Sequence, residues 1–111
     1  MAGSDINVVP AWEVTTGRPD VIVAISDGGL QWDHPDMARN MWVNQAEFNG
    51  KPGVDDDGNG YVDDIYGYNF LVSSGGYGMK GTITPGDHGT HVGGTVAAVN
   101  NNGVGVCGIA G

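Results

Sequence analysis

Hydrophobic and polar residues are arranged in blocks along the chain, and three of these blocks predict secondary structure. Val21–Ile25 (VIVAI) is a continuous, mostly β-branched apolar run between turn residues, which is typical of a strand buried on both faces of a parallel sheet. Ile65–Leu71 (IYGYNFL) predicts a second, weaker strand. After His88, valines recur at helical spacing as far as Val99 and predict a helix.

The segments between these blocks predict short or irregular structure. Asn7–Thr15 suits a short helix, and Asn40–Phe48 suits a loop with a brief ordered turn. Gly50–Asp64 and Ser73–Gly86 are rich in glycine and predict exposed loops, while Asn100–Gly103 is expected to stop the last helix. The expected fold class is therefore α/β, with a mainly parallel sheet and the last helix packed on it, in one domain over residues 1–111.

Composition narrows the classes of partner. The chain has 111 residues and a net charge of −9, which argues against nucleic acid and anionic membrane surfaces. No run approaches the roughly 18 apolar residues of a membrane span. The single cysteine, Cys107, allows no internal disulfide and is expected to be a buried packing residue. Met1–Ser4 resembles an initiator followed by a cloning remnant, without a secretory signal.

Two polar blocks carry candidate catalytic chemistry. Asp27 lies just past the carboxyl end of the predicted strand Val21–Ile25, and functional groups collect at the carboxyl ends of strands in open α/β sheets. His88 lies at the predicted helix start, within Asp87–Thr95 (DHGTHVGGT). A carboxylate can fix the tautomer of an imidazole, which then takes a proton from a nucleophile. Each residue alone also fits a plainer role, a turn former for Asp27 and a helix cap for His88.

Together these blocks resemble the subtilisin-like serine proteases. The resemblance rests on AISDGGL around Asp27, on His34-Pro35-Asp36, on HGTHVGGTVAA from His88 and on GVCGIAG, which follow one another in that family's order. It implies a subtilisin-like three-layer α/β fold, of which the chain is the N-terminal part. It also implies serine-type endopeptidase activity, with Asp27 as the orienting carboxylate and His88 as the general base.

Three positions depart from the family pattern. Gly28 stands where Ser or Thr is usual, Ser26 where an aliphatic residue is usual, and Asp87 where a small residue is more common. Gly28 therefore lacks a hydroxyl that can help to hold the neighbouring carboxylate.

The third member of the family's triad has no counterpart in these residues. None of the serines lies in a Gly-Thr-Ser-Met-Ala-type setting; they are Ser4, Ser26, Ser73 and Ser74. The chain by itself is therefore expected to be an inactive fragment that holds two of three triad roles. The alternative is a non-catalytic calcium-binding or interaction module on a truncated protease scaffold.

The acidic loop predicts a calcium site. Oxygen ligands occur at alternate positions of DDDGNGYVDD, and the predicted ligands are Asp55, Asp57, Asn59, the backbone carbonyl of Tyr61, and Asp63. Hard oxygen ligands favour calcium over zinc or copper. The bidentate glutamate of a full EF-hand is absent, so a shorter calcium loop is expected, and a solvated acidic loop is the alternative.

The resemblance implies a second structural calcium. In many subtilisin-like proteases the aspartate of the His-Pro-Asp block shares a calcium with the loop after the histidine helix. In this sequence those positions are Asp36, Asn101 or Asn102, and the backbone carbonyls of Val99, Val104 and Val106. The asparagines alone also fit a simple helix stop.

Expected partners follow from the same resemblance. A polypeptide substrate is expected once a missing C-terminal segment or a second chain supplies the serine. Exposed strand edges and apolar faces predict a homo-oligomer or strand-swapped dimer. The parent protein is expected to be secreted.

Overall fold

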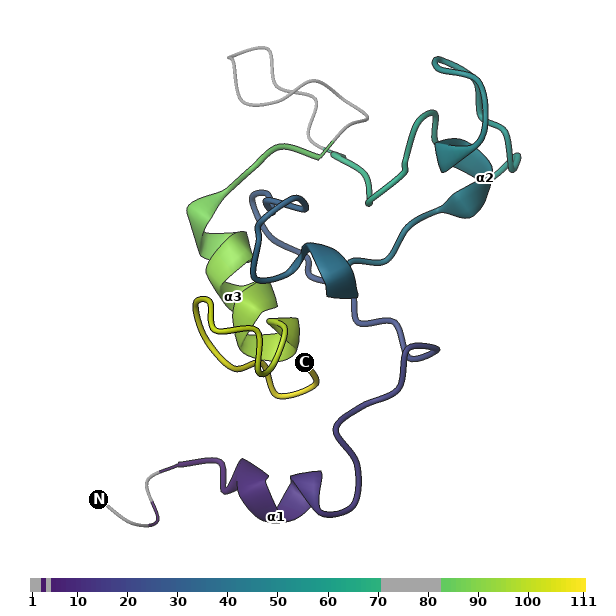
Figure 1. Cartoon of the computed structure of the whole chain (residues 1–111). Coiled ribbons are helices and arrows are strands. Elements are labelled where there is room, and N and C mark those ends of the chain that lie inside the picture. The colour runs from purple at the N-terminus through teal and green to yellow at the C-terminus, as the bar shows by residue number, and fades with distance from the viewer. Residues whose placement is uncertain (1–2, 4, 71–82) are drawn as a thin grey trace.

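The computed structural model describes residue 3, residues 5–70 and residues 83–111, and in these residues short helices are joined by long loops (Figure 1). The helical elements are α1 (Val8–Trp12), the 3₁₀ helix η1 (Ala38–Asn40), α2 (Gln45–Phe48) and α3 (Asp87–Ala97). The predicted short helix within Asn7–Thr15 is confirmed by α1. The brief ordered turn predicted in Asn40–Phe48 corresponds to α2.

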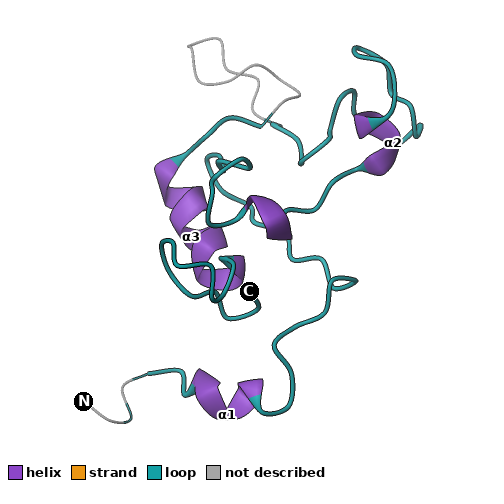
Figure 2. Cartoon of the chain, in the orientation of Figure 1, coloured by secondary structure: helices purple, strands orange, loops and turns teal. Residues whose placement is uncertain are grey.

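The predicted α/β fold with a mainly parallel sheet is wrong for this structure, because the described residues form no strand and no sheet (Figure 2). Val21–Ile25 has no strand partner in the part of the chain that the structure describes, and the exposed fractions of Val21, Ile22 and Val23 are 63%, 62% and 56%. A strand is held by backbone hydrogen bonds to a neighbouring strand. No such pairing is formed by Val21–Ile25 within the described residues, so its β-branched residues do not become part of a sheet.

The second predicted strand is also not formed in its described part. Ile65 and Gly67 are joined by an isolated bridge, and Leu71 lies outside the described residues, as do Ser73 and Ser74. Gly67 has a φ of +127°, a conformation that interrupts an extended strand.

Helix α3 confirms the helix predicted from the valine spacing, but it ends earlier than expected. Ala98 leaves the helix with φ −59° and ψ 142°, two residues before the asparagine run. The N–H groups of Gly108, Ile109 and Ala110 donate to carbonyls at the end of α3 and just beyond it, at 3.2, 3.1 and 2.8 Å. The helix end is therefore satisfied by the returning C-terminal loop, drawn in yellow against α3 in Figure 1, rather than by a local cap.

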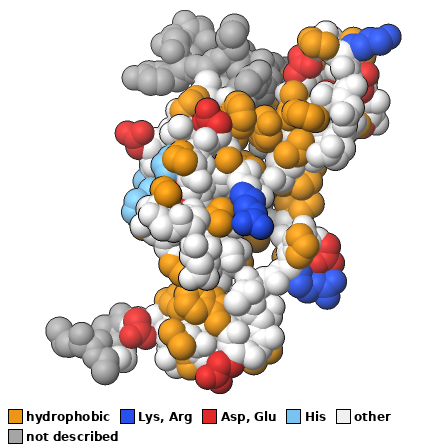
Figure 3. All heavy atoms as spheres, viewed as in Figure 1, with side chains coloured by type: hydrophobic (Ala, Val, Ile, Leu, Met, Phe, Trp, Pro, Cys, Tyr) orange, Lys and Arg blue, Asp and Glu red, His pale blue; other side chains and the backbone are white. Residues whose placement is uncertain are grey.

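The small buried core lies between α3 and the loop before η1. Met37, Ala98 and Val99 are its buried hydrophobic residues, and Gly93 of α3 faces the Leu30 side chain. Many other hydrophobic side chains lie on the visible surface (Figure 3).

The N-terminal helix reaches the C-terminal loop through one long-range hydrogen bond. The indole N–H of Trp12 donates to the carbonyl of Ile109 at 2.7 Å. Within the described part of the chain, every helix is too short or too polar to cross a membrane.

Candidate catalytic site

Asp27 and His88 form a direct side-chain pair. Nδ1 of His88 lies 2.6 Å from Oδ2 of Asp27, although the two residues are 61 positions apart in the sequence. Asp27 follows the extended Val21–Ile25 segment, and His88 lies in the first turn of α3. The structure therefore brings together the two residues that the sequence predicted as orienting carboxylate and general base.

Hydrogen bonds hold the loop after Asp27 against the start of α3. The N–H of Leu30 donates to the carbonyl of Thr84 at 2.9 Å, and the N–H of Gln31 donates to the Thr90 hydroxyl at 2.8 Å. That hydroxyl in turn donates to the carbonyl of Gly86 at 2.7 Å. Thr90 thus links the aspartate loop to the helix that carries the histidine.

Two glycines make this close approach possible. A Cβ atom at Gly89 would overlap the carbonyl oxygen of Gly29 and touch the Cβ of Asp27. Gly29 itself has a φ of +150° and packs against the Thr84 carbonyl. Because glycine has no side chain, the backbone after Asp27 can lie directly on α3.

The environment of the pair keeps the carboxylate ionised and the imidazole accessible. The side chain of Asp27 is 16% exposed and that of His88 is 82% exposed. The backbone N–H of Gly28, 2.7 Å from Oδ1, and the hydrogen bond to His88 lower the pKa of Asp27. Gly28 therefore holds the carboxylate through its backbone, without the hydroxyl that is usual in the family. With Nδ1–H assigned as donor to Asp27, Nε2 of His88 is free to accept a proton.

Asp36 lies in a different environment, buried beneath the loop that follows α3. It is 2% exposed, and it accepts hydrogen bonds from the Asn102 amide at 2.7 Å and from the Val106 N–H at 2.8 Å. These bonds, the one from Val106 first, lower the pKa of Asp36. The amide oxygen of Asn102 accepts from the N–H of Val104 at 2.9 Å. Asp36 and Asn102 are thus together, while Asn101 is exposed with a φ of +61°.

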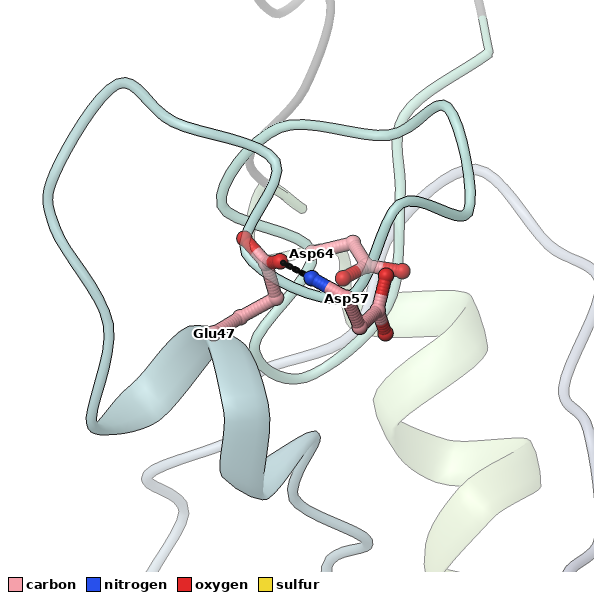
Figure 4. A group of neighbouring side chains, drawn as sticks. All are labelled: Glu47, Asp57 and Asp64. Carbon is pink, nitrogen blue, oxygen red and sulfur yellow. Dashed lines mark hydrogen bonds between the residues drawn. The ribbon is translucent and has the colours of Figure 1, made fainter.

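Helix α2 and the acidic loop together provide a cluster of three carboxylates that can hold a metal ion. Oxygens of Glu47, Asp57 and Asp64 lie within 4.8 Å of one another (Figure 4). Glu47 and Asp64 are buried, at 4% and 8% exposure. The Asn44 amide donates to Asp57 at 2.9 Å and to Asp64 at 2.8 Å. The hydrogen bond from Asn44 is the main cause that lowers the pKa of Asp57, and the Glu47 carboxylate accepts the backbone N–H groups of Asp56 and Asp63 at 2.7 and 2.9 Å.

The five predicted calcium ligands of this loop do not all meet at one point. Asp57 belongs to the cluster, and the Asn59 amide donates to Asp57 and Asp64 at 3.2 and 3.0 Å. Asp55 instead accepts backbone N–H groups of the loop, and the N–H of Tyr61 donates to the Asn59 side chain at 2.8 Å. Asp63 accepts the N–H of Gly53 at 2.9 Å.

Glu47 and Asp64 were missed by the sequence reasoning. Glu47 precedes the acidic loop on α2, where the side-chain oxygen of Asn44 accepts the N–H of Ala46 at 3.3 Å. Asp63 has a left-handed φ of +54°, and its neighbour Asp64 enters the cluster. The Asn44-x-x-Glu47 spacing at a helix start was the available signal, because it places both side chains near the same helix end.

The prediction that Cys107 is buried is wrong. Cys107 is exposed, and its thiol lies 2.7 Å from the side-chain oxygen of Asn100. Val106 and Ile109 beside it are exposed as well, so this part of the C-terminal loop lies on the surface.

Comparison of the sequence with known proteins shows which family the chain belongs to. The profile of the Subtilase family matches residues 18–111. The chain belongs to the subtilase family. Its Asp27–His88 pair lies within the part of the chain that matches the family.

Individual relatives cover most of this chain. It is 45% identical to Subtilisin-like protease 1 of Plasmodium vivax over 80% of its own length and 13% of the relative. It is 36% identical to the Halolysin-like extracellular serine protease Nep of Natrialba magadii, over 98% of this chain and 16% of the relative. It is 33% identical to Furin-like protease 1, isoform 1-CRR, of Drosophila melanogaster, over 97% of this chain and 8% of the relative. The chain thus spans less than a fifth of the length of these relatives.

Proposed function

We propose that this chain supplies the Asp–His part of the catalytic triad of a subtilisin-like serine endopeptidase. The observation that carries the proposal is the 2.6 Å contact between Nδ1 of His88 and the carboxylate of Asp27. In this role Nε2 of His88 takes the proton of a serine hydroxyl as that oxygen attacks a peptide carbonyl, and later gives it to the leaving amine. Asp27 holds the ring orientation and stabilises the imidazolium.

The serine is proposed to come from outside these 111 residues. Ser26 is exposed next to Asp27, and the other serines lie outside the described residues. We therefore propose that the chain alone is inactive. The alternative function, a non-catalytic calcium-binding or interaction module, is supported by the carboxylate cluster and needs no nucleophile.

Complementation separates these two functions. The chain is mixed with the part of Plasmodium vivax Subtilisin-like protease 1 that follows its matched region, and hydrolysis of a fluorogenic peptide is measured. The protease proposal predicts activity in the mixture, none in either piece, and none with His88→Ala. A complex that forms between the two pieces but hydrolyses no peptide would support the non-catalytic module.

We further propose that the cluster of Glu47, Asp57 and Asp64 holds a structural calcium ion. Carboxylate oxygens are ligands that calcium prefers, and the three converge within 4.8 Å. Within the described ranges the ion pairs are Arg18–Asp20 and His88–Asp27, so the cluster has no protein cation there. The Asp36–Asn102 contact is a second candidate, although both oxygens of Asp36 already accept hydrogen bonds.

Thermal unfolding tests the calcium proposal without any assay of activity. Calcium at about 100 times its dissociation constant is expected to stabilise the chain by about 2.7 kcal/mol relative to chelator. Glu47→Gln should abolish this gain, whereas Glu13→Gln, at an exposed glutamate outside the cluster, should retain it. An unchanged melting temperature at millimolar calcium would contradict the proposal.

We also propose that the parent protein acts outside the cell. The relative from Natrialba magadii is named an extracellular protease, and calcium concentrations sufficient for a structural site are usual outside cells.

A further inference from the structure

A groove of about 570 Å³ runs beside α3. One wall is the helix face that carries Asp87 and His91, and the opposite side is formed by the loop of His34 and by the loop of Cys107. Histidine side chains gather on the visible surface over α3 (Figure 3). The groove is distinct from the carboxylate cluster of Glu47.

The groove adjoins the catalytic pair. Asp87 and His91, which line it, are one residue before and three residues after His88 on the same helix. Consecutive residues of an extended peptide are only about 3.3 Å apart. A peptide whose scissile bond lies at His88 therefore places a neighbouring side chain at the groove.

The groove has a negative charge balance. Asp87 and the buried Asp36 both line it, and no Lys or Arg is among its described lining residues. The whole chain has 13 acidic and four basic residues. The oxygens of Asp36 are engaged by Asn102 and Val106, which leaves Asp87 as the exposed carboxylate of the groove. A negative concave surface attracts and orients a cationic side chain.

We propose that this groove binds a basic side chain of the peptide substrate adjacent to the scissile bond, and that Asp87 is the residue that selects it. This inference rests on the proposed protease function and extends it to the class of substrate. Asp87 also lies in the first turn of α3, where a carboxylate favours the helix through its dipole. That structural role predicts lower stability on substitution but no preference for one peptide charge over another.

Peptide binding to the 111-residue chain provides the test, and it requires no hydrolysis. Amide chemical shifts of the ¹⁵N-labelled chain are followed on titration with Ac-Ala-Ala-Lys-Ala-Ala-NH₂ or with its Glu counterpart. Low ionic strength and about pH 8 are used, where an ordinary histidine is uncharged. The lysine peptide is expected to bind more tightly and to shift the signals of Thr90, His91 and Cys107.

Two substitutions locate the selectivity. Asp87→Asn should weaken binding of the lysine peptide about two- to fivefold, and Asp87→Lys should reverse the preference towards the glutamate peptide. Glu13→Gln makes the same change of charge at an exposed site away from the groove and should have no effect. Equal binding of the two peptides would overturn the proposal, as would an equal loss in Asp87→Asn and Glu13→Gln. Failed complementation would instead count against the protease function, so the two failures are distinguishable.

Discussion

Asp27 and Asp36 are both held ionised, but their neighbours give them different uses. Asp27 has one oxygen on the backbone of Gly28 and the other on an imidazole that is open to solvent. Asp36 has both oxygens on groups of the loop after α3 and is buried. The first arrangement suits proton transfer, and the second suits structural anchoring.

Replacing the carboxylate of Asp27 should lower the catalytic rate of the complemented enzyme while the chain still folds. In the complemented enzyme, Asp27→Asn is expected to lower kcat on the order of 10³–10⁴-fold, because an amide no longer fixes the required tautomer of His88. Steady-state kinetics measures this loss. Asp20→Asn, at an exposed aspartate paired with Arg18, is the control and should retain full kcat; a comparable loss there would refute the assigned role.

Acid should weaken the structure through Asp36. Its pKa in the folded chain lies below the ordinary value of 3.8, so the stability that it contributes is present above about pH 4 and is lost as the pH falls through the folded pKa. The stability difference between the wild type and Asp36→Asn should therefore shrink from pH 6 towards pH 3 in denaturant titrations. A difference that stays constant across this range would exclude the ionised carboxylate as the cause.

Helix α3 is the element that organises the site. It carries His88 in its first turn, receives the aspartate loop at Gly89, and has its last carbonyls bound by the C-terminal loop. The helix itself was predictable because its hydrogen bonds lie within one continuous segment. The end of the helix could not be predicted in this way, because it depends on a hydrogen bond from the distant Gly108 to the carbonyl of Ala98.

Two glycines of α3 should respond oppositely to alanine. Gly89→Ala is expected to destabilise the chain by about 1–3 kcal/mol, since the new methyl group overlaps the Gly29 carbonyl. Gly94→Ala meets only the Met37 sulfur and a Val106 methyl group at ordinary contact distances of 3.7 and 3.9 Å. It should be neutral or stabilising by up to about 1 kcal/mol because alanine favours helix. Chemical denaturation gives the free energy of unfolding of both variants. Equal changes in the two variants would contradict the prediction.

The whole molecule is more extended than a compact domain of its length. Its radius of gyration is 16.1 Å, against about 13 Å expected for a compact chain of this size. Three consecutive apolar residues, Val21, Ile22 and Val23, are exposed in one segment. Such surfaces favour association with another chain.

Self-association is therefore predicted for the isolated chain. Light scattering should give a mass above that of a monomer at high concentration, and Ile22→Lys should reduce it by placing a charge in the Val21–Ile25 segment. Ile6→Lys, at a residue that is 71% exposed, introduces the same charge elsewhere and should leave the measured mass unchanged. A clean monomer mass at high concentration would contradict the prediction.

The sequence by itself determined the features that depend on a short stretch of chain. These are the helix after His88, the acidic loop, and the Asp27 and His88 blocks with the family they indicate. The tertiary structure decided which distant groups meet: Asp27 with His88, Asp36 with Asn102, and Glu47 with Asp57 and Asp64. It also decided that Val21–Ile25 forms no sheet within the described residues. The physical reason is that a helix closes its hydrogen bonds locally, whereas a strand, a carboxylate cluster or a catalytic pair needs a partner from elsewhere in the chain.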